Sequence, residues 1–354
     1  MSALETGARG VGAYFTAAEL VGVDFPEPRW AVPGIVPEGL SLLAGAPKSG
    51  KSWMLLGLGW AVACGGHALG RVAVETGSVL YAALEDSPRR LQDRLRKVLG
   101  DEPAPLGLHL VTVLPQMPRA VELIDEWLED HPDARLVIVD VLGKVRPATG
   151  PQTDRYEHDY KVIGALKALA DRRQVAVLIA THTRKMGAED VFDMVSGSIG
   201  LTAAADATLV LRRARGETDA TLHVTGRDVP ESEYALSFDP TRCVWTLAGS
   251  GLAEAASRAA AVRASAGLGD DSAAVVDFIA AHPAGVTPAE VAAHMGWTDR
   301  KTATYLTRLY DAGRIDRPTR GIYTPVGSVG SVGNEQDNPT LPTLPTPPEG
   351  GEVW

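Results

Sequence analysis

The sequence predicts an α/β protein with a mostly parallel sheet that ends in an antiparallel meander, followed by a small α+β domain. Three features predict this fold class. From Gly39 onward, short runs of Val, Ile and Leu alternate with helical stretches, as in an open parallel sheet. After Ala204 the apolar runs are short and separated by turn-rich segments, which is typical of a meander. Residues 271–325 then form a second compact pattern, and 354 residues are about enough for two domains.

The parallel part of the sheet is predicted from five apolar runs without clean alternation, since strands covered on both faces have no polar side. These runs are Leu40–Ala44, Val79–Leu84, Leu108–Val113, Leu136–Asp140 and Val175–Ala180. Helices are predicted between them at Lys51–Cys64, Arg89–Leu99, Ala120–Glu129 and Tyr156–Arg172. The meander is predicted at Ala207–Arg212, Ala220–Thr225, Tyr234–Phe238 and Cys243–Leu247.

Changes in composition divide the chain into five segments. Residues 1–32 are a loop-rich lead-in, and residues 33–247 form the main domain. Residues 248–270 are rich in Ala, Gly and Ser and are predicted to be a flexible linker with some helix. Residues 271–325 form the second domain, and the stretch 326–354, with its repeated Ser-Val-Gly and Thr-Leu-Pro-Thr, is predicted to be a disordered tail.

The composition excludes several classes of protein. With 45% hydrophobic and 22% charged residues, the chain is not disordered, collagen-like or stapled by disulfides. Its two cysteines, Cys64 and Cys243, are too few for a disulfide framework or a four-cysteine zinc site, and they suit a reducing, cytoplasmic compartment. The first residues lack the pattern of a secretory signal, and the uncharged run 52–70 is better explained by a buried helix than by a membrane span.

The formal net charge of −10 limits how the chain can contact nucleic acid. A chain this acidic does not coat DNA as a histone does. Contacts with DNA must instead come from local basic patches, or from a channel that several copies of the chain line together.

A phosphate-binding loop is predicted between the first strand of the sheet and the first long helix. Residues 45–52 match the pattern G-x-x-x-x-G-K-[ST], and they lie in the strand–loop–helix context that the pattern requires. The loop N–H groups and the helix N-terminus favour phosphate, Lys51 can reach the β- and γ-phosphates, and the Ser52 hydroxyl can hold Mg²⁺. The predicted nucleotide-binding residues are Gly45, Ala46, Pro47, Lys48, Ser49, Gly50, Lys51, Ser52 and the adjacent Trp53.

Carboxylates follow two other predicted strands. Asp140 ends an apolar strand in the Walker B form and is predicted to hold Mg²⁺ with Ser52, the alternative being a turn residue after a buried strand. Val141 follows it, so a catalytic carboxylate must come from another strand. We predict that Glu85 is the general base, on a strand that can lie beside the phosphate-loop strand. Glu85 and Asp86 could instead cap the next helix, and for Asp86 the two roles are equally supported.

Residues 30–247 resemble the RecA-like P-loop ATPases (AAA family ATPases in the broad sense), and within them the plasmid RepA-type hexameric replicative DNA helicases. The resemblance is carried by the phosphate loop, by residues 84–86 after the second strand, by Asp140, and by residues 180–185 after the fifth strand. Residues 197–202 and 225–230 fit the same family. The Glu after the second strand, combined with the His after the fifth, is the most specific part of this pattern.

The resemblance implies roles for further residues. Glu85 would be the catalytic glutamate, and His182 would sense the γ-phosphate and signal the nucleotide state to DNA-facing loops. The alternative for His182 is a partly buried histidine with one hydrogen bond. A RecA-like ring also needs an arginine from the neighbouring subunit to neutralise the transferring phosphate. Arg227 is the first choice, Arg212 and Arg213 are alternates, and each could instead be a solvated surface residue.

Basic residues follow two of the strand ends at which the resemblance places loops that face a central channel. They are Lys144, Arg146, Arg184 and Lys185. Six copies of such loops would line a channel that holds single-stranded DNA by its phosphates without regard to sequence. The alternative is that these side chains are ordinary exposed cations.

The second domain resembles a winged helix-turn-helix. A helix at Ser272–Ala281 is followed by a helix with a capping box at residues 287–290, by a longer helix at Asp299–Ala312, and by a hairpin in which residues 314–316 pair with 321–323. Leu306 and Leu309 are predicted to face inward. The predicted DNA-binding residues on the exposed side of the longer helix are Arg300, Lys301, Thr304 and Arg308. The alternative is a winged helix that docks onto protein.

Together these features predict an ATP-hydrolysing DNA helicase or translocating motor that uses ATP and Mg²⁺. It is expected to act on single-stranded or duplex DNA as a homo-hexamer, with replication partners and without membrane contact, in the replication of a plasmid, phage or mobile element. The alternative is a RecA-like ATPase switch that regulates or partitions DNA without unwinding it. A small-molecule kinase is the weakest candidate, because it explains neither the winged helix nor Glu85.

Overall fold

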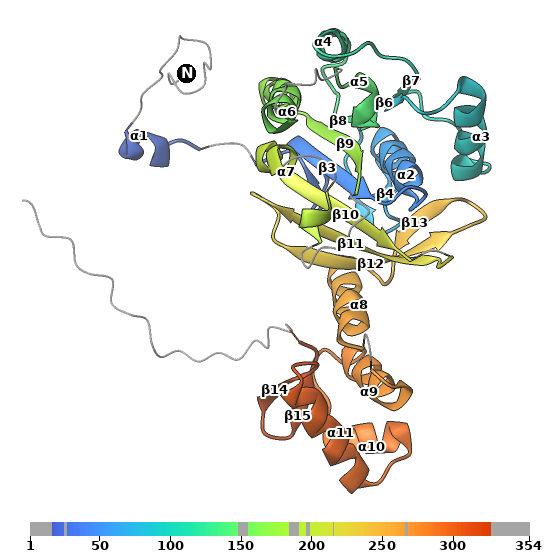
Figure 1. Ribbon diagram of the computed structural model, residues 1–354, viewed down its shortest axis with the longest axis vertical. Helices are drawn as coiled ribbons and strands as arrows, with labels where there is room; N and C mark the ends of the chain where they lie inside the picture. The colour runs from blue at the N-terminus through green and yellow to red at the C-terminus, as the bar shows by residue number, and fades with distance from the viewer. Residues whose placement is uncertain are drawn as a thin grey trace, which may run out of the picture. The chain divides into compact units, whose positions relative to one another are not determined.

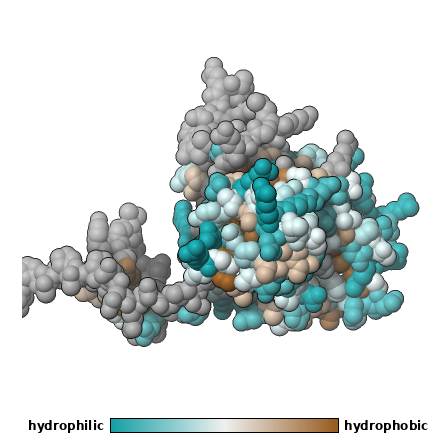
Figure 2. Space-filling model, turned by 90° about the horizontal axis from the view of Figure 1, so that it is seen from below, coloured by the Kyte–Doolittle hydropathy of each residue, from teal (hydrophilic) through white to brown (hydrophobic). Residues whose placement is uncertain are grey.

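The structure, a computed structural model, describes residues 16–24, 27–147, 155–183, 191–195, 199–214, 216–265 and 268–326. The chain forms two compact units, Met1–Arg263 and Ala264–Trp354. Each unit has its own hydrophobic core. In the part of the chain that the structure describes, no helix has the length and apolar character needed to cross a membrane. Figure 2 shows a face on which hydrophilic residues predominate and hydrophobic residues are scattered.

A nine-stranded sheet forms the centre of the first unit (Figure 1). Its order is β13-β12-β11-β10-β3-β9-β8-β6-β7, parallel from β10 to β7 and antiparallel from β10 to β13. The strands are β3 (Gly39–Gly45), β6 (Val79–Ala83), β7 (Leu108–Val111), β8 (Leu136–Asp140), β9 (Ala176–His182), β10 (Ala207–Arg213), β11 (Asp219–Gly226), β12 (Ser232–Asp239) and β13 (Val244–Leu247). The predicted parallel sheet with a terminal meander is confirmed.

Helices cover both faces of the parallel strands (Figure 1). The core on one face includes α2 (Lys51–Cys64) and α3 (Pro88–Leu99). The core on the other includes α4 (Arg119–Asp130), α5 (Leu142–Val145), α6 (Arg155–Arg173) and α7 (Ile199–Ala204). Along β3, Leu42 and Leu43 therefore pack into different cores, because successive side chains point to opposite faces. This double burial explains why the strands are continuous apolar runs.

Short elements complete the first unit. They are α1 (Ala17–Val21), β1 (Trp30–Val32), β2 (Val36–Pro37), β4 (His67–Ala68), β5 (Val72–Ala73) and the 3₁₀ turn η1 (Phe192–Met194). Strands β1 and β2 pair with each other, and Ala31 and Val32 are buried in the main core. The last residues of the predicted lead-in, residues 30–32, thus belong to the folded unit.

The position of β6 corrects one prediction. The sequence suggested that the strand before Glu85 can lie beside the phosphate-loop strand, but β9 and β8 separate β6 from β3. The reason is the course of α2, which contacts β7 and β8 as well as β3 and so lies across the sheet. The chain therefore re-enters the sheet several strands away, and the later strands β8 and β9 fill the space between.

The segment predicted as a flexible linker also differs from expectation. Residues Leu252–Ser265 form helix α8, and Ala255 is fully buried in the core of the first unit. Leu252 and Ala256 pack against the same core. Alanine is the best helix former and its small side chain allows close packing, so the low-complexity composition here encodes a packed helix.

The second unit contains three helices and a hairpin. They are α9 (Asp270–Ala280), α10 (Pro288–Met295), α11 (Asp299–Asp311), β14 (Asp316–Thr319) and β15 (Ile322–Thr324). The predicted capping box of Thr287 and Glu290 is present, and Leu306 and Leu309 are buried as predicted. The hairpin strands begin one or two residues later than predicted and turn at Arg320-Gly321. This order of helices followed by a hairpin is a winged helix-turn-helix.

Asp206 is a buried carboxylate that ties three elements of the first unit together. Its Oδ2 accepts a hydrogen bond of 2.7 Å from the Leu40 N–H at the start of β3, and it lies 3.0 Å from the Lys167 ammonium on α6. Its Oδ1 lies 3.7 Å from the exposed guanidinium of Arg227. Because the side chain is only 10% exposed, these contacts compensate a charge that has lost most of its hydration.

Asp206→Ala is expected to lower the free energy of unfolding by about 3 kcal/mol, since it leaves a partly buried ammonium and a buried N–H without their acceptor. The matched control is Asp171→Ala, which removes the other carboxylate partner of Lys167 at a position that is 52% exposed. That change is expected to cost at most about 1 kcal/mol. Guanidinium unfolding of the two variants measures the difference, and equal costs would contradict the role given to Asp206.

Candidate active site

The loop between β3 and α2 has a conformation that only its own residues allow. Lys48 and Gly50 have left-handed backbones with φ of 65° and 100°. A Cβ at Gly50 would lie 2.9 Å from the Trp245 ring, whose Nε1 donates a hydrogen bond of 3.1 Å to the Gly50 carbonyl. Gly50 thus supplies both a positive φ and room for a neighbouring ring.

Lys51 lies at the centre of the site. Its ammonium is buried and donates hydrogen bonds to the carbonyls of Gly45 at 2.7 Å and Ala46 at 3.1 Å. Burial lowers the pKa of Lys51, while the negative charges of Asp140 and Glu85 act in the opposite direction. Both predicted carboxylates are therefore near enough to act on this ammonium.

His182 also lies beside Lys51, with its Nδ1 at 3.5 Å from the Lys51 Nζ. The register of the sheet explains this position, because Gly45 on β3 is paired with His182 on the adjacent parallel strand β9. His182 is exposed at the carboxyl end of its strand, which is the end at which ligands bind in open α/β sheets.

A buried tyrosine fixes the orientation of Asp140. Asp140 ends β8, and Tyr81 on the neighbouring strand β6 donates a hydrogen bond of 3.0 Å to its Oδ2. Tyr81 is fully buried. Burial and then the charge of Asp140 raise the pKa of Tyr81 well above its ordinary value, so the hydroxyl stays a donor. One carboxylate oxygen of Asp140 is held in this way.

Glu85 and Asp86 have different roles in the structure. Asp86 is buried and forms ion pairs with Arg94 at 2.7 Å and Arg90 at 3.5 Å. The helix cap is Ser87, whose hydroxyl accepts from the Arg90 N–H. Glu85 is exposed and takes no part in the cap. Asp86 therefore anchors the segment that presents Glu85.

The arginines considered for an action between subunits lie at opposite ends of the sheet. Arg227 follows β11 beside Asp206, at the end of the sheet away from Lys51 of the same chain. Arg212 and Arg213 end β10 at the phosphate-loop end. Arg212 is exposed, whereas the Arg213 guanidinium lies 5.2 Å from the centre of the Trp245 ring.

The predicted channel cations are placed only in part. Lys144 is exposed on the single-turn helix α5. Arg146 forms an ion pair with the buried Asp159 of α6, so it is a partner of the fold rather than a free loop cation. Arg184 and Lys185 lie outside the described residues.

In the second unit, three of the four predicted DNA-binding residues form one exposed row on α11. Arg300, Thr304 and Arg308 are exposed and follow one another at intervals of four residues, which places them on one side of a helix. Lys301 instead pairs with Asp271 of α9 at 2.8 Å and lies 3.9 Å from the centre of the Trp297 ring. Lys301 thus joins α11 to α9.

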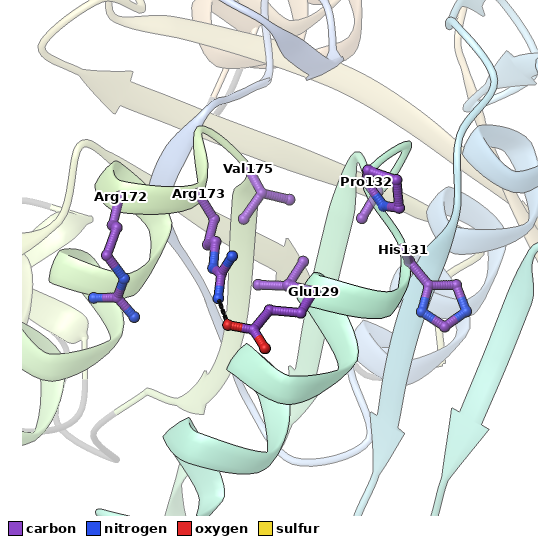
Figure 3. Close-up of a pocket in the computed structure, with 8 residues that line it drawn as sticks. Glu129, His131, Pro132, Arg172, Arg173 and Val175 are labelled. Carbon is purple, nitrogen blue, oxygen red and sulfur yellow. Dashed lines mark hydrogen bonds and ion pairs between the residues drawn. The ribbon is translucent and has the colours of Figure 1, made fainter. Parts of the chain in front are cut away.

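A second hollow of about 310 Å³ lies at the amino ends of β8 and β9, away from Asp140 and His182. Figure 3 shows Arg173 turned toward Glu129, with which it forms an ion pair of 2.6 Å. Arg172 and Arg173 also pair with Asp125. Because both arginines already have carboxylate partners, the described residues that line this hollow offer no free guanidinium to a ligand phosphate.

Three residues of the site were missed from the sequence. Trp245 and Tyr81 contact the site from strands far away in the chain, and no motif marks either one. Arg94 lies 5.1 Å from the Trp53 ring centre and also holds Asp86. Its position, eight residues after Asp86 on a helix face with Arg90, is the one signal that was available.

Comparisons with known proteins agree with this organisation. Residues 13–188 match a family model described as an AAA domain, and residues 274–326 match one described as "Transcriptional regulator, AbiEi antitoxin". No curated protein matches the sequence.

Two solved structures are similar at low identity. One is the ATPase domain of another protein, with 15% identity, a TM-score of 0.49, and coverage of 59% of this chain and 84% of that chain. The other is a DnaB-like replicative helicase, with 16% identity, a TM-score of 0.47, and coverage of 59% of this chain and 57% of that chain.

The first unit has the fold of the RecA-like P-loop ATPases. This follows from the phosphate loop after the central strand β3, the strand β9 between β3 and the Asp140 strand, and the antiparallel meander. The AAA domain match supports the same class over residues 13–188.

Tyr81→Phe is expected to lower the free energy of unfolding by about 1.5–3 kcal/mol, because Asp140 loses a hydrogen bond to its charged form. The control is Tyr234→Phe, a buried tyrosine whose hydroxyl has no hydrogen bond to another described residue. Urea unfolding of the full chain at neutral pH measures both variants. Equal effects of the two changes would show that the Tyr81 hydroxyl does not stabilise Asp140.

Proposed function

We propose that this protein hydrolyses ATP with Mg²⁺ and couples hydrolysis to movement along DNA. The observation that carries the proposal is the convergence on Lys51. His182 lies 3.5 Å from its ammonium, and Asp140 and Glu85 are the two carboxylates that act on its pKa. A buried loop lysine surrounded by a histidine and two carboxylates is suited to phosphoryl transfer to water.

The residues of the loop fit a triphosphate. The Ser49 hydroxyl is buried and has no hydrogen-bond partner in the described part of the chain, so an acceptor such as a phosphate oxygen would satisfy it. A Cβ at Gly45 would come within 2.9 Å of the same Ser49 Oγ, which leaves the loop room only for backbone. The N-terminus of the 14-residue helix α2 adds favourable partial positive charge.

The residues also fit Mg²⁺, with help from the nucleotide. Among the described residues, no group of three or more His, Cys, Asp or Glu side chains could hold a metal ion alone. Mg²⁺ commonly takes one or two protein ligands together with substrate phosphates and water. Ser52 and the Asp140 carboxylate are the protein ligands that we propose. When bound, Mg²⁺ neutralises charge that develops on the phosphates.

The remaining residues then have distinct tasks. Glu85, exposed at the end of the segment that Asp86 anchors, takes a proton from the attacking water. Lys51 stabilises negative charge on the terminal phosphate, and His182 responds to the presence of that phosphate. In a homo-hexamer, Arg227 of a neighbouring copy would complete the site, with Arg212 or Arg213 as alternatives.

DNA is the proposed track. The exposed row Arg300, Thr304 and Arg308 is locally basic in a chain of net charge −10, and it lies on the second helix of a winged helix-turn-helix. Arg317 on the hairpin strand β14 adds to this surface, since the strand is exposed along its whole length. We propose that this unit binds duplex DNA, while Lys144, Arg184 and Lys185 face single-stranded DNA in a ring.

A second candidate is a DNA-binding ATPase switch without unwinding activity. The match of residues 274–326 to a transcriptional regulator favours it, because such a unit can tether an ATPase to one DNA site. The two candidates differ in whether hydrolysis separates the strands of a forked duplex.

Glu85→Gln is expected to lower ATP turnover by at least about 100-fold, because a general base contributes about 10²–10⁴ in rate. The affinity for ATP is expected to stay within about twofold of that of the natural chain, since tight binding depends on the loop rather than on this carboxylate. Glu102→Gln, another exposed glutamate of the same unit, serves as the control. Steady-state phosphate release and calorimetric ATP binding give the two values, and unchanged turnover in Glu85→Gln would overturn the assignment.

The double change Arg300→Ala and Arg308→Ala is expected to weaken duplex binding and to reduce the slope of log K against log[salt] by about 2, one per phosphate contact. Its unfolding midpoint should not move, because both side chains are exposed. Lys301→Ala is the counterpart, since it breaks the contacts with Asp271 and Trp297 and is expected to lower that midpoint. Fluorescence anisotropy with a labelled duplex at several salt concentrations checks the slope; an unaltered slope would favour a protein-docking role.

A further inference from the structure

A cleft of about 230 Å³ runs beside helix α2. We call it the tryptophan cleft and define it by Trp53, Gly57, Trp60, Val244 and Trp245. The cleft is not part of the catalytic cluster around Lys51, and neither the hydrolysis chemistry nor the DNA contacts use it.

The spacing of residues on α2 creates the cleft. Trp53, Gly57 and Trp60 lie on one side of the helix, and the two tryptophans are about 10 Å apart along its axis at 1.5 Å per residue. A Cβ at Gly57 would meet no atom within 4 Å, so the glycine leaves open space between two indole rings. An aromatic residue on each side of a gap is an arrangement that suits a flat ring.

The cleft is continuous with the phosphate loop. Trp53 directly follows Ser52, and Trp245 both lines the cleft and donates its Nε1–H to the Gly50 carbonyl. The Arg94 guanidinium lies 5.1 Å from the centre of the Trp53 ring and is held by Asp86. Since Arg94 does not line the cleft, it supports Trp53 from another side and leaves the cleft-facing surface of the ring available.

We propose that the tryptophan cleft binds the heteroaromatic base of the nucleotide whose phosphates occupy the loop. This inference rests on the proposed function, because it assumes a nucleotide with its terminal phosphate at Lys51. The other end of that nucleotide must then leave the loop in a direction away from Glu85 and Lys51, and the cleft begins one residue past Ser52 along α2. Binding is by stacking on indole rings, which tolerates different bases because every base has a π-face.

The test compares ATP with inorganic tripolyphosphate, which has the phosphates and no base. Gly57→Leu fills the cleft with a side chain that favours helix, so the fold is retained. We expect it to weaken ATP binding by about tenfold or more, the range for loss of one stacked base, and to leave tripolyphosphate binding within about twofold. Gly164→Leu on α6, where a Cβ also meets nothing within 4 Å, is the matched control and should change neither affinity.

Calorimetry in the presence of Mg²⁺ distinguishes the outcomes. If Gly57→Leu binds ATP as tightly as the natural chain, the base lies elsewhere; the inference fails while the proposed function stands. A changed assembly mass in Gly57→Leu with unchanged ATP affinity would show instead that a second copy covers the cleft. If the natural chain binds neither ATP nor tripolyphosphate, the proposed function itself fails, and with it the inference. Equal weakening of both ligands in Gly57→Leu would mean that the phosphate loop was disturbed, and this would also overturn the assignment of the cleft to the base.

Discussion

The ammonium of Lys51, buried at the end of β3, is the feature on which the rest of the site depends. An isolated buried charge is costly, and here it is compensated by two loop carbonyls and by the fields of Asp140 and Glu85. Its position requires the curled loop, and the loop requires Gly50 against Trp245. Each neighbour of the site can be understood as a group that this charge keeps in place.

A layer of supporting contacts surrounds that charge. Tyr81 holds one oxygen of Asp140, and Arg94 holds Asp86, which sets the segment that presents Glu85. These contacts come from β6, α3 and β13, so the site is assembled by elements far apart in the sequence. Residues that act on phosphate therefore sit on strands and on the start of a helix, where their positions are firmly fixed.

Sequence reasoning identified the elements and the chemical groups but not their arrangement. Helix α2 has the bounds that were predicted, because left-handed glycines at positions 50 and 65 flank it. His182 was placed correctly at a strand end, since an apolar run followed by a polar residue marks that point. The order of strands was not accessible, because pairing partners depend on the whole sheet, and so β6 was wrongly placed beside β3. The bond of Trp245 to Gly50 spans 195 residues and leaves no local trace.

The most direct test of this account is a crystal structure with a non-hydrolysable ATP analogue and Mn²⁺ in place of Mg²⁺. The account predicts an anomalous peak between Ser52 and Asp140, the terminal phosphate at the Lys51 ammonium, and a water between that phosphate and the Glu85 carboxylate. A terminal phosphate remote from Lys51, or a Glu85 side chain turned away from it, would contradict the account.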